Sequence, residues 1–318
     1  MNTLVIMLKN VLIFVLLAIP GYLLVKKNML NQKESGAMSK LLTNIGMPFM
    51  ILSSTIKLEL TGEFTKSMIV MAVVGSLFVV LMFIASAWFV AKDSDAKRRD
   101  MMRFCMVFAN NGFIGIPLAR AVFGENSPVM AFLIVLNIIN NVLMFTMGVY
   151  LISGDKNTIN IKKAVLNPVL IAFLVGIALN LLGVPKAVPE VQTYATHFSG
   201  IVTPLSMVIL GMKLAGVEMK KLFTSGHMYY MSATRLVIFP VISVAVIWLL
   251  HLIPGLSLGG DAVIAFFVAF AMPTAGLAST FSDQYQGDTE NAVIFTLGST
   301  ILSIATIPVL YWALRLFV

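Results

Sequence analysis

Charged residues are scarce in this sequence. They make up 11% of its 318 residues, whereas hydrophobic residues make up 59%. Soluble domains carry about 25% charged residues, so this composition excludes an ordinary soluble fold and predicts many membrane spans. The net charge is +8, but no solvated basic domain is available, so nucleic acid is not an expected partner.

Residues that support metal or covalent chemistry are equally few. The only cysteine, Cys105, cannot form an internal disulfide and is expected to be a small buried residue. His197, His227 and His251 are far apart and lack metal-ligand spacing. The chain has neither a G-x-S-x-G nucleophile elbow nor a Tyr-Asp pair of an intramembrane aspartyl protease. We therefore expect no enzyme activity, no metal and no cofactor.

Long apolar segments dominate what is present. A spanning helix needs roughly 20 apolar residues, and ten segments satisfy this, which predicts an all-α integral membrane protein. The ten predicted spans are 4–24, 38–57, 65–91, 101–123, 128–152, 164–182, 194–216, 227–251, 260–284 and 289–316.

Lysine and arginine predict the orientation of these spans, because cytoplasmic loops carry an excess of them. The odd-numbered connections hold most of these residues, among them Lys97, Arg98 and Arg99 in the third. This pattern places both termini on the extracytoplasmic side of the cell membrane.

The two halves of the chain resemble each other at intervals of about 160 residues. Pro48 in the second span corresponds to Pro204 in the seventh, and Trp88 in the third to Trp248 in the eighth. Because each half has five spans, the second half must enter the membrane in the opposite sense. We therefore predict two inverted five-helix repeats, residues 1–155 and 160–318.

Two of the predicted spans contain residues that interrupt helices. The fourth carries Asn110, Asn111, Gly112, Gly115 and Pro117, and Gly and Pro cost about 1 and 3 kcal/mol in a helix interior relative to Ala. Unwound backbone at membrane depth is tolerated where it lines protein or a water-filled cavity. This cluster therefore predicts a local break and a binding site.

The ninth span has a matching interruption at 271–280, which contains Pro273, Thr274 and Ala275. Broken helices in corresponding halves indicate the binding site of a secondary transporter, and their half-helix N-termini favour an anion. The alternative is that the glycines permit close helix packing and the asparagines join helices.

Two further residues are candidates for the site. Arg235 lies inside the eighth span, where it either contacts substrate or a helix end, or is an anchor that reaches the membrane surface; Asp283 is its suggested opposite charge. Asn44 precedes the proline kink at Pro48 and is a second-rank candidate.

Several stretches resemble the auxin efflux carrier family, in its bacterial branch of malate and malonate permeases. They are NNGFIGIPLARAVFG at 110–124, TPLSMVILGMKL at 203–214, RLVIFP at 235–240, the run from Ala271 through DQYQGD to Asp288, and STILSIATIP at 299–308.

The resemblance implies a fold with broken crossing helices 4 and 9, as in bile-acid symporters and sodium-proton antiporters. It implies a scaffold of helices 1, 2, 6 and 7, a mobile transport domain of helices 3–5 and 8–10, elevator movement and a homodimer. Bile-acid symporters use an acid in the second crossing helix to bind sodium, and none occurs at 272–280.

The expected function is secondary active transport of a small organic anion, such as malate, across the cell membrane. A coupling proton or sodium ion and the lipid bilayer are the other expected partners. The alternatives are a sodium-coupled symporter of amphipathic carboxylates and a membrane receptor that does not transport.

Overall fold

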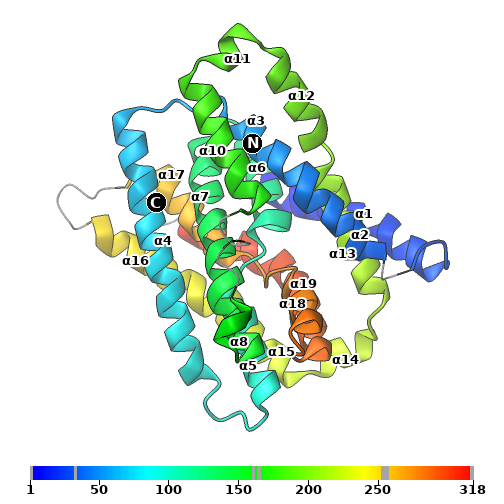
Figure 1. Ribbon diagram of the computed structural model, residues 1–318. Helices are drawn as coiled ribbons and strands as arrows, with labels where there is room; N and C mark the ends of the chain where they lie inside the picture. Colours follow the sequence, from blue (N-terminus) through cyan, green and yellow to red (C-terminus); the bar gives the residue numbers. More distant parts are fainter. Residues whose placement is uncertain (1–2, 32–33, 160–161, 163–165, 252–257, 316–318) are drawn as a thin grey trace. The chain divides into compact units, whose positions relative to one another are not determined.

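The chain is predominantly helical in the part that the computed structural model describes, residues 3–31, 34–159, 162, 166–251 and 258–315 (Figure 1). The predicted all-α class is confirmed there, since those residues form no β-strand beyond one isolated bridge. The elements, with the labels of Figure 1, are α1 (Thr3–Lys26), α2 (Glu34–Leu41), η1 (Leu42–Gly46), α3 (Met47–Thr55), α4 (Gly62–Phe89), α5 (Ala96–Val107), η2 (Asn111–Gly115), α6 (Ile116–Phe123), α7 (Pro128–Leu143), η3 (Met144–Gly148), α8 (Val149–Ser153), η4 (Lys156–Thr158), α10 (Pro168–Leu181), α11 (Val184–Ala187), α12 (Glu190–Ser199), α13 (Val202–Ala215), α14 (Met219–Thr224), α15 (Gly226–Ala233), η5 (Thr234–Ile238), α16 (Phe239–His251), α17 (Gly260–Ala271), α18 (Ala278–Gln284) and α19 (Thr289–Leu314).

Five continuous helical stretches in the described residues are long and apolar enough to cross a membrane. They coincide with the predicted spans three, five, seven, eight and ten, and the other predicted spans are shorter or interrupted helices. The predicted boundaries at residues 1, 160, 164, 316 and 318 lie outside the described residues. The stretches are Gly62–Phe89, Pro128–Ser153, Glu190–Ala215, Gly226–Leu250 and Thr289–Leu314.

The chain divides into two compact units, each built from three separate stretches of sequence. Unit 1 comprises Met1–Phe64, Gly112–Ile134 and Leu166–Val217. Unit 2 comprises Thr65–Asn111, Val135–Val165 and Glu218–Val318, and it contains most of the candidate site.

Small residues allow the helices of unit 1 to pack with their backbones in contact. A Cβ atom on Gly211 of α13 would collide with the carbonyl oxygen of Ala18 in α1. A Cβ atom on Gly176 of α10 would likewise collide with the side chain of Thr55 in α3. Such close approach is a common basis of helix association in lipid, where no hydrophobic force drives helices together.

We expect Gly211→Ala to destabilise the protein by about 1–3 kcal/mol, because overpacking against rigid backbone cannot be relieved by a side-chain rotation. The measurement is the thermal unfolding midpoint of the purified protein. Gly36→Ala is the matched control, since a Cβ there meets no atom within 4 Å. Equal midpoints for the two variants would show that the α1–α13 contact is not tight.

Aromatic side chains fill the interior of unit 2. Phe78 of α4 packs edge-on against Phe270 of α17, with ring centroids 4.6 Å apart. The rings of Phe104 and Phe108 pack together with a centroid separation of 5.0 Å. An added Cβ on Gly148 would come within 2.8 Å of the Phe104 ring, so this glycine lets the end of the fifth predicted span approach the first broken helix.

Wide π-helical turns precede three of the prolines. The turns η1, η2 and η5 each end two residues before a proline, at Pro48, Pro117 and Pro240 respectively. Proline has no N–H to bond the carbonyl four residues earlier, and its ring clashes with that carbonyl, so the preceding turn widens. The turn η5 carries Arg235, and η2 begins at Asn111, so two of these turns contain candidate site residues.

Candidate functional site

The two broken helices meet in unit 2 through their unwound backbones. After α5 ends, residues 108–110 are extended; after α17 ends, the chain is non-helical until α18 begins. The Asn110 N–H donates to the Pro273 carbonyl at 2.8 Å, and the Ala275 N–H donates to the Phe108 carbonyl at 2.8 Å. These two bonds form a short antiparallel bridge, which we call the crossing (residues 108–110 and 273–275).

The first break is shorter than the sequence suggests. The prediction placed the unwound segment over Asn110 to Pro117, but Asn111–Gly115 forms the π-turn η2 and α6 follows directly. Only three residues leave helical geometry, because a wide turn accommodates the glycines and Pro117 without breaking the chain of hydrogen bonds. The second break, before α18, is confirmed over its central residues.

A buried asparagine on α7 holds the crossing from one side. The Ala109 N–H donates to Asn140 Oδ1 at 3.1 Å, and Asn140 Nδ2 donates back to the Ala109 carbonyl at 3.1 Å. This amide therefore satisfies both backbone groups of a residue that has left the helix. Asn140 is 4% exposed and was not among the sequence candidates. Its position at helical spacing from Asn137, in an apolar span, was the available signal.

Hydroxyl groups hold the second segment of the crossing, residues 273–275. The Thr274 N–H donates to Ser299 Oγ of α19 at 3.2 Å, and Thr274 Oγ1 donates to the Cys105 carbonyl at 2.9 Å. Thr274, Ser299 and Cys105 are all fully buried. The prediction that Cys105 is a small buried residue is confirmed, and Thr274 has a structural contact in the crossing.

Arg235 lies with its guanidinium against the C-terminal ends of both α5 and α17. Nε donates to the Met272 carbonyl at 2.9 Å, at the C-terminal end of α17. Nη1 donates to the Met106 and Val107 carbonyls at 3.2 Å each, at the C-terminal end of α5. Carbonyls at a helix C-terminus carry partial negative charge, so the cation stabilises both ends at once.

Arg235 is not an anchor at the membrane surface, because its side chain is fully buried. The suggested pairing with Asp283 is wrong: Asp283 is exposed and accepts a hydrogen bond from Thr289 at 2.7 Å. No ion pair in the described part of the chain includes Arg235. The carbonyl ends of two helices supply the compensating charge that a carboxylate was expected to supply.

Several buried polar atoms of unit 2 have no hydrogen-bond partner among the described residues. They include Asn111 Oδ1, Asn137 Nδ2, Thr296 Oγ1 and Arg235 Nη2. Asn137 and Thr296 lie one turn before Asn140 and Ser299, the two residues that hold the crossing. Buried polar groups are normally paired, so these four atoms could each accept a polar partner that the described residues do not supply.

The remaining candidates belong to unit 1. Gly112 and Gly115 lie in η2, and Pro117 lies in α6. The second stretch of unit 1 begins at Gly112. Asn44 is exposed, and its Nδ2 donates to the Lys40 carbonyl of its own helix at 2.7 Å. Their role in binding stays a prediction.

The described chain is helical and contains apolar helices long enough to span a membrane. Its two broken helices meet through buried backbone beside a buried arginine. These features are typical of a multi-pass membrane transporter. Residues 5–311 match a family model described as "Membrane transport protein". The chain belongs to this family, that of the auxin efflux carriers, and the resemblance seen in the sequence is confirmed.

Two relatives extend over most of the chain. An "Uncharacterized transporter" of Methanothermobacter thermautotrophicus is 26% identical over 304 residues, covering 94% of each protein. A "Putative malonate transporter" of Rhizobium meliloti is 24% identical over 266 residues, covering 80% of this chain and 79% of the relative.

Proposed function

We propose that this protein is a secondary active transporter that moves a small organic anion across the cell membrane by alternating access, with the substrate bound at the crossing. The observation that carries the proposal is the buried guanidinium of Arg235, whose Nη2 has no partner among the described residues. The helix-end carbonyls bond Nε and Nη1 and carry only partial charge, so the remaining Nη2 donor of this cation favours an anionic ligand.

The site can also orient such a ligand. The Asn137 amide has an unpaired Nδ2 donor and the Asn111 amide an unpaired Oδ1 acceptor within the described residues. A carboxylate accepts hydrogen bonds from amide and guanidinium donors, and a hydroxy acid can donate to the amide oxygen. The relative described as a malonate transporter supports a dicarboxylate of the malonate or malate type.

Equivalent contacts in the two halves support the inverted repeat of ten helices. Asn140 of the fifth predicted span accepts from the crossing residue Ala109, and Ser299 of the tenth accepts from the crossing residue Thr274. The members of each equivalent pair are about 160 residues apart, as in the sequence comparison.

The closest helix contacts of unit 1 also occur at equivalent positions in the two halves of the chain. Ala18 and Gly176 occupy equivalent places in the first and sixth predicted spans, and Thr55 and Gly211 in the second and seventh. Ala18 meets Gly211, and Gly176 meets Thr55. Two pairs of helices thus approach most closely at corresponding positions, as two copies of one ancestral unit would.

The two compact units support the proposed division into scaffold and transport domain. Unit 1 collects the first, second, sixth and seventh predicted spans together with 112–134, and unit 2 collects most of the others. In the proposed elevator movement unit 2 carries the bound anion, while a homodimer forms through the scaffold.

Counterflow in proteoliposomes tests the function. Vesicles preloaded with unlabelled malonate or malate should accumulate the labelled dicarboxylate, whereas protein-free vesicles and vesicles preloaded with a neutral sugar should not. Counterflow that requires sodium on both sides would favour the sodium-coupled symporter. Saturable binding without any counterflow would reject transport and favour the receptor.

Cysteine labelling tests the proposed topology with both termini outside. In a Cys105→Ala background, Ser94→Cys lies in the third connection and Val188→Cys in the sixth, and both positions are exposed. We expect an impermeant maleimide added outside intact cells to label Val188→Cys and not Ser94→Cys. The reverse pattern would contradict the orientation predicted from the basic residues.

A further inference from the structure

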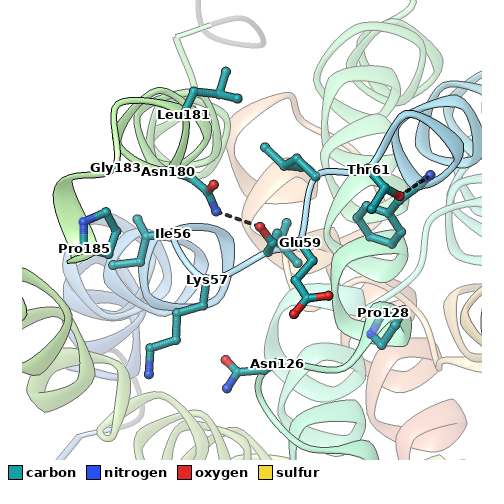
Figure 2. Close-up of a pocket in the computed structure, with 13 residues that line it drawn as sticks. Ile56, Lys57, Glu59, Thr61, Asn126, Pro128, Asn180, Leu181, Gly183 and Pro185 are labelled. Carbon is teal, nitrogen blue, oxygen red and sulfur yellow. Dashed lines mark hydrogen bonds between the residues drawn. The ribbon is translucent and has the colours of Figure 1, made fainter.

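Unit 1 contains a pocket of about 1120 Å³ that has no part in the transport site (Figure 2). Its wall consists of the linker between α3 and α4, the end of the loop before α7, and the turn between α10 and α11. These are the second, fourth and sixth connections of the proposed topology, so the pocket lies at one membrane surface.

Hydrogen bonds fix the linker between α3 and α4, which forms part of the wall of this pocket. Asn180 Nδ2 donates to the Thr55 carbonyl at 3.2 Å and to the Leu58 carbonyl at 2.9 Å. At the other end of the linker, the Phe64 N–H donates to Thr61 Oγ1 at 3.2 Å. The residues between these points, among them Lys57 and Glu59, are therefore held in place at the pocket.

Two opposite charges line the pocket without pairing. Figure 2 shows the Lys57 amine and the Glu59 carboxylate extending to the same side of the linker, with the Asn126 amide between them. Both side chains are exposed, and neither takes part in an ion pair of the described residues. Two opposite charges held apart suit a ligand that itself carries both signs.

Apolar side chains line the same pocket. Leu58 and Phe64 belong to its wall, and Leu181 at the end of α10 is 72% exposed. The neighbouring Leu182 is 76% exposed. Exposed leucines beside charged groups at the end of a spanning helix suit the boundary between lipid headgroups and acyl chains.

We propose that this pocket binds a zwitterionic phospholipid with an ethanolamine headgroup, from the leaflet that these connections face. Lys57 pairs with the phosphate, Glu59 accepts hydrogen bonds from the primary ammonium, and an acyl chain lies on Leu181. A choline headgroup has no N–H to donate, and a glycerol headgroup has no positive charge, so both should bind less well. The site does not depend on the transport proposal, but its place at a membrane surface and the identity of the leaflet rest on the proposed topology.

Native mass spectrometry of the full-length protein tests the assignment, with added phosphatidylethanolamine, phosphatidylcholine or phosphatidylglycerol of identical acyl chains. We expect phosphatidylethanolamine to bind about three- to fivefold better than the other two, the size of one exposed charge pair. Glu59→Gln should remove this preference, whereas Lys57→Gln should weaken the binding of all three lipids, because each of them carries the phosphate. Lys27→Gln is the control, because Lys27 is an exposed lysine of unit 1 outside the pocket.

Equal binding of the three lipids by the wild-type protein, an unchanged preference in Glu59→Gln, or unchanged binding in Lys57→Gln would overturn the proposal. Competition by glycerophosphoethanolamine as strong as by the intact lipid would also overturn it, because a soluble ligand would then suffice. Counterflow measured on the same preparations separates the two hypotheses. A wild-type protein that transports but shows no lipid preference rejects only the lipid site, and one that shows the preference but does not transport rejects only the transporter.

Discussion

Arg235→Lys is expected to lose most transport activity, even though lysine keeps the positive charge. The guanidinium donates from two nitrogens to carbonyls of two different helix ends, Met272 on one side and Met106 with Val107 on the other. A point ammonium cannot reach both ends in this geometry. Removing one partner of a buried charged hydrogen bond commonly costs about 2–5 kcal/mol, so the rate should fall at least about tenfold.

The measurement is the initial counterflow rate, with the thermal unfolding midpoint recorded on the same samples at matched expression. Arg235→Ala should lose at least as much as Arg235→Lys. Arg99→Lys is the control, because the Arg99 side chain is 38% exposed and pairs only loosely with Asp100, at 3.8 Å. Wild-type transport in Arg235→Lys would show that a positive charge alone suffices, and wild-type transport in Arg235→Ala would remove Arg235 from the binding machinery.

Replacing Asn140 is expected to disrupt the crossing more than replacing any other single uncharged residue that holds it. Asn140→Leu keeps the approximate size but leaves both the N–H and the carbonyl of Ala109 without a partner. Each buried unsatisfied group costs about 1–3 kcal/mol, so the variant should lose about 2–6 kcal/mol. Ser299→Ala removes a single bond, to the Thr274 N–H, and should lose correspondingly less.

Counterflow rate and thermal unfolding, measured with and without substrate, check this ordering. Asn140→Asp keeps the acceptor for the Ala109 N–H and loses the donor to its carbonyl, so it separates the two bonds. Asn157→Ala, in the exposed turn η4, is the control. If Asn140→Leu behaved like Asn157→Ala, the crossing would be held by its own backbone bridge, and the amide would not be a positioning residue.

Local chemistry explains which features could be predicted from the sequence. Few charges and long apolar segments predict helices in a membrane, because lipid offers no other partner for the backbone groups. Glycine and proline predict where two of those helices break, since their conformational cost acts within a few residues of the chain. Arg235 stood out because an arginine deep in an apolar span needs a partner.

The hydrogen-bond partners of the site residues could not be predicted, because they lie far apart in the sequence. Arg235 was expected to pair with an acid such as Asp283, but its partners are backbone carbonyls, which every residue carries and which no sequence pattern distinguishes. Asn140 looks like any asparagine in an apolar helix until Ala109 lies against it.

The sequence by itself therefore determined the class of protein, the family resemblance, five of the spans and the approximate positions of the two breaks, because composition and backbone propensity act locally. Only the tertiary structure decided that the breaks pair as an antiparallel bridge between Ala109 and Thr274, and that Asn140, Ser299 and Arg235 hold it. Those contacts form only when helices distant in the sequence pack together, since a backbone group freed by glycine or proline bonds whichever donor or acceptor the packing brings within reach.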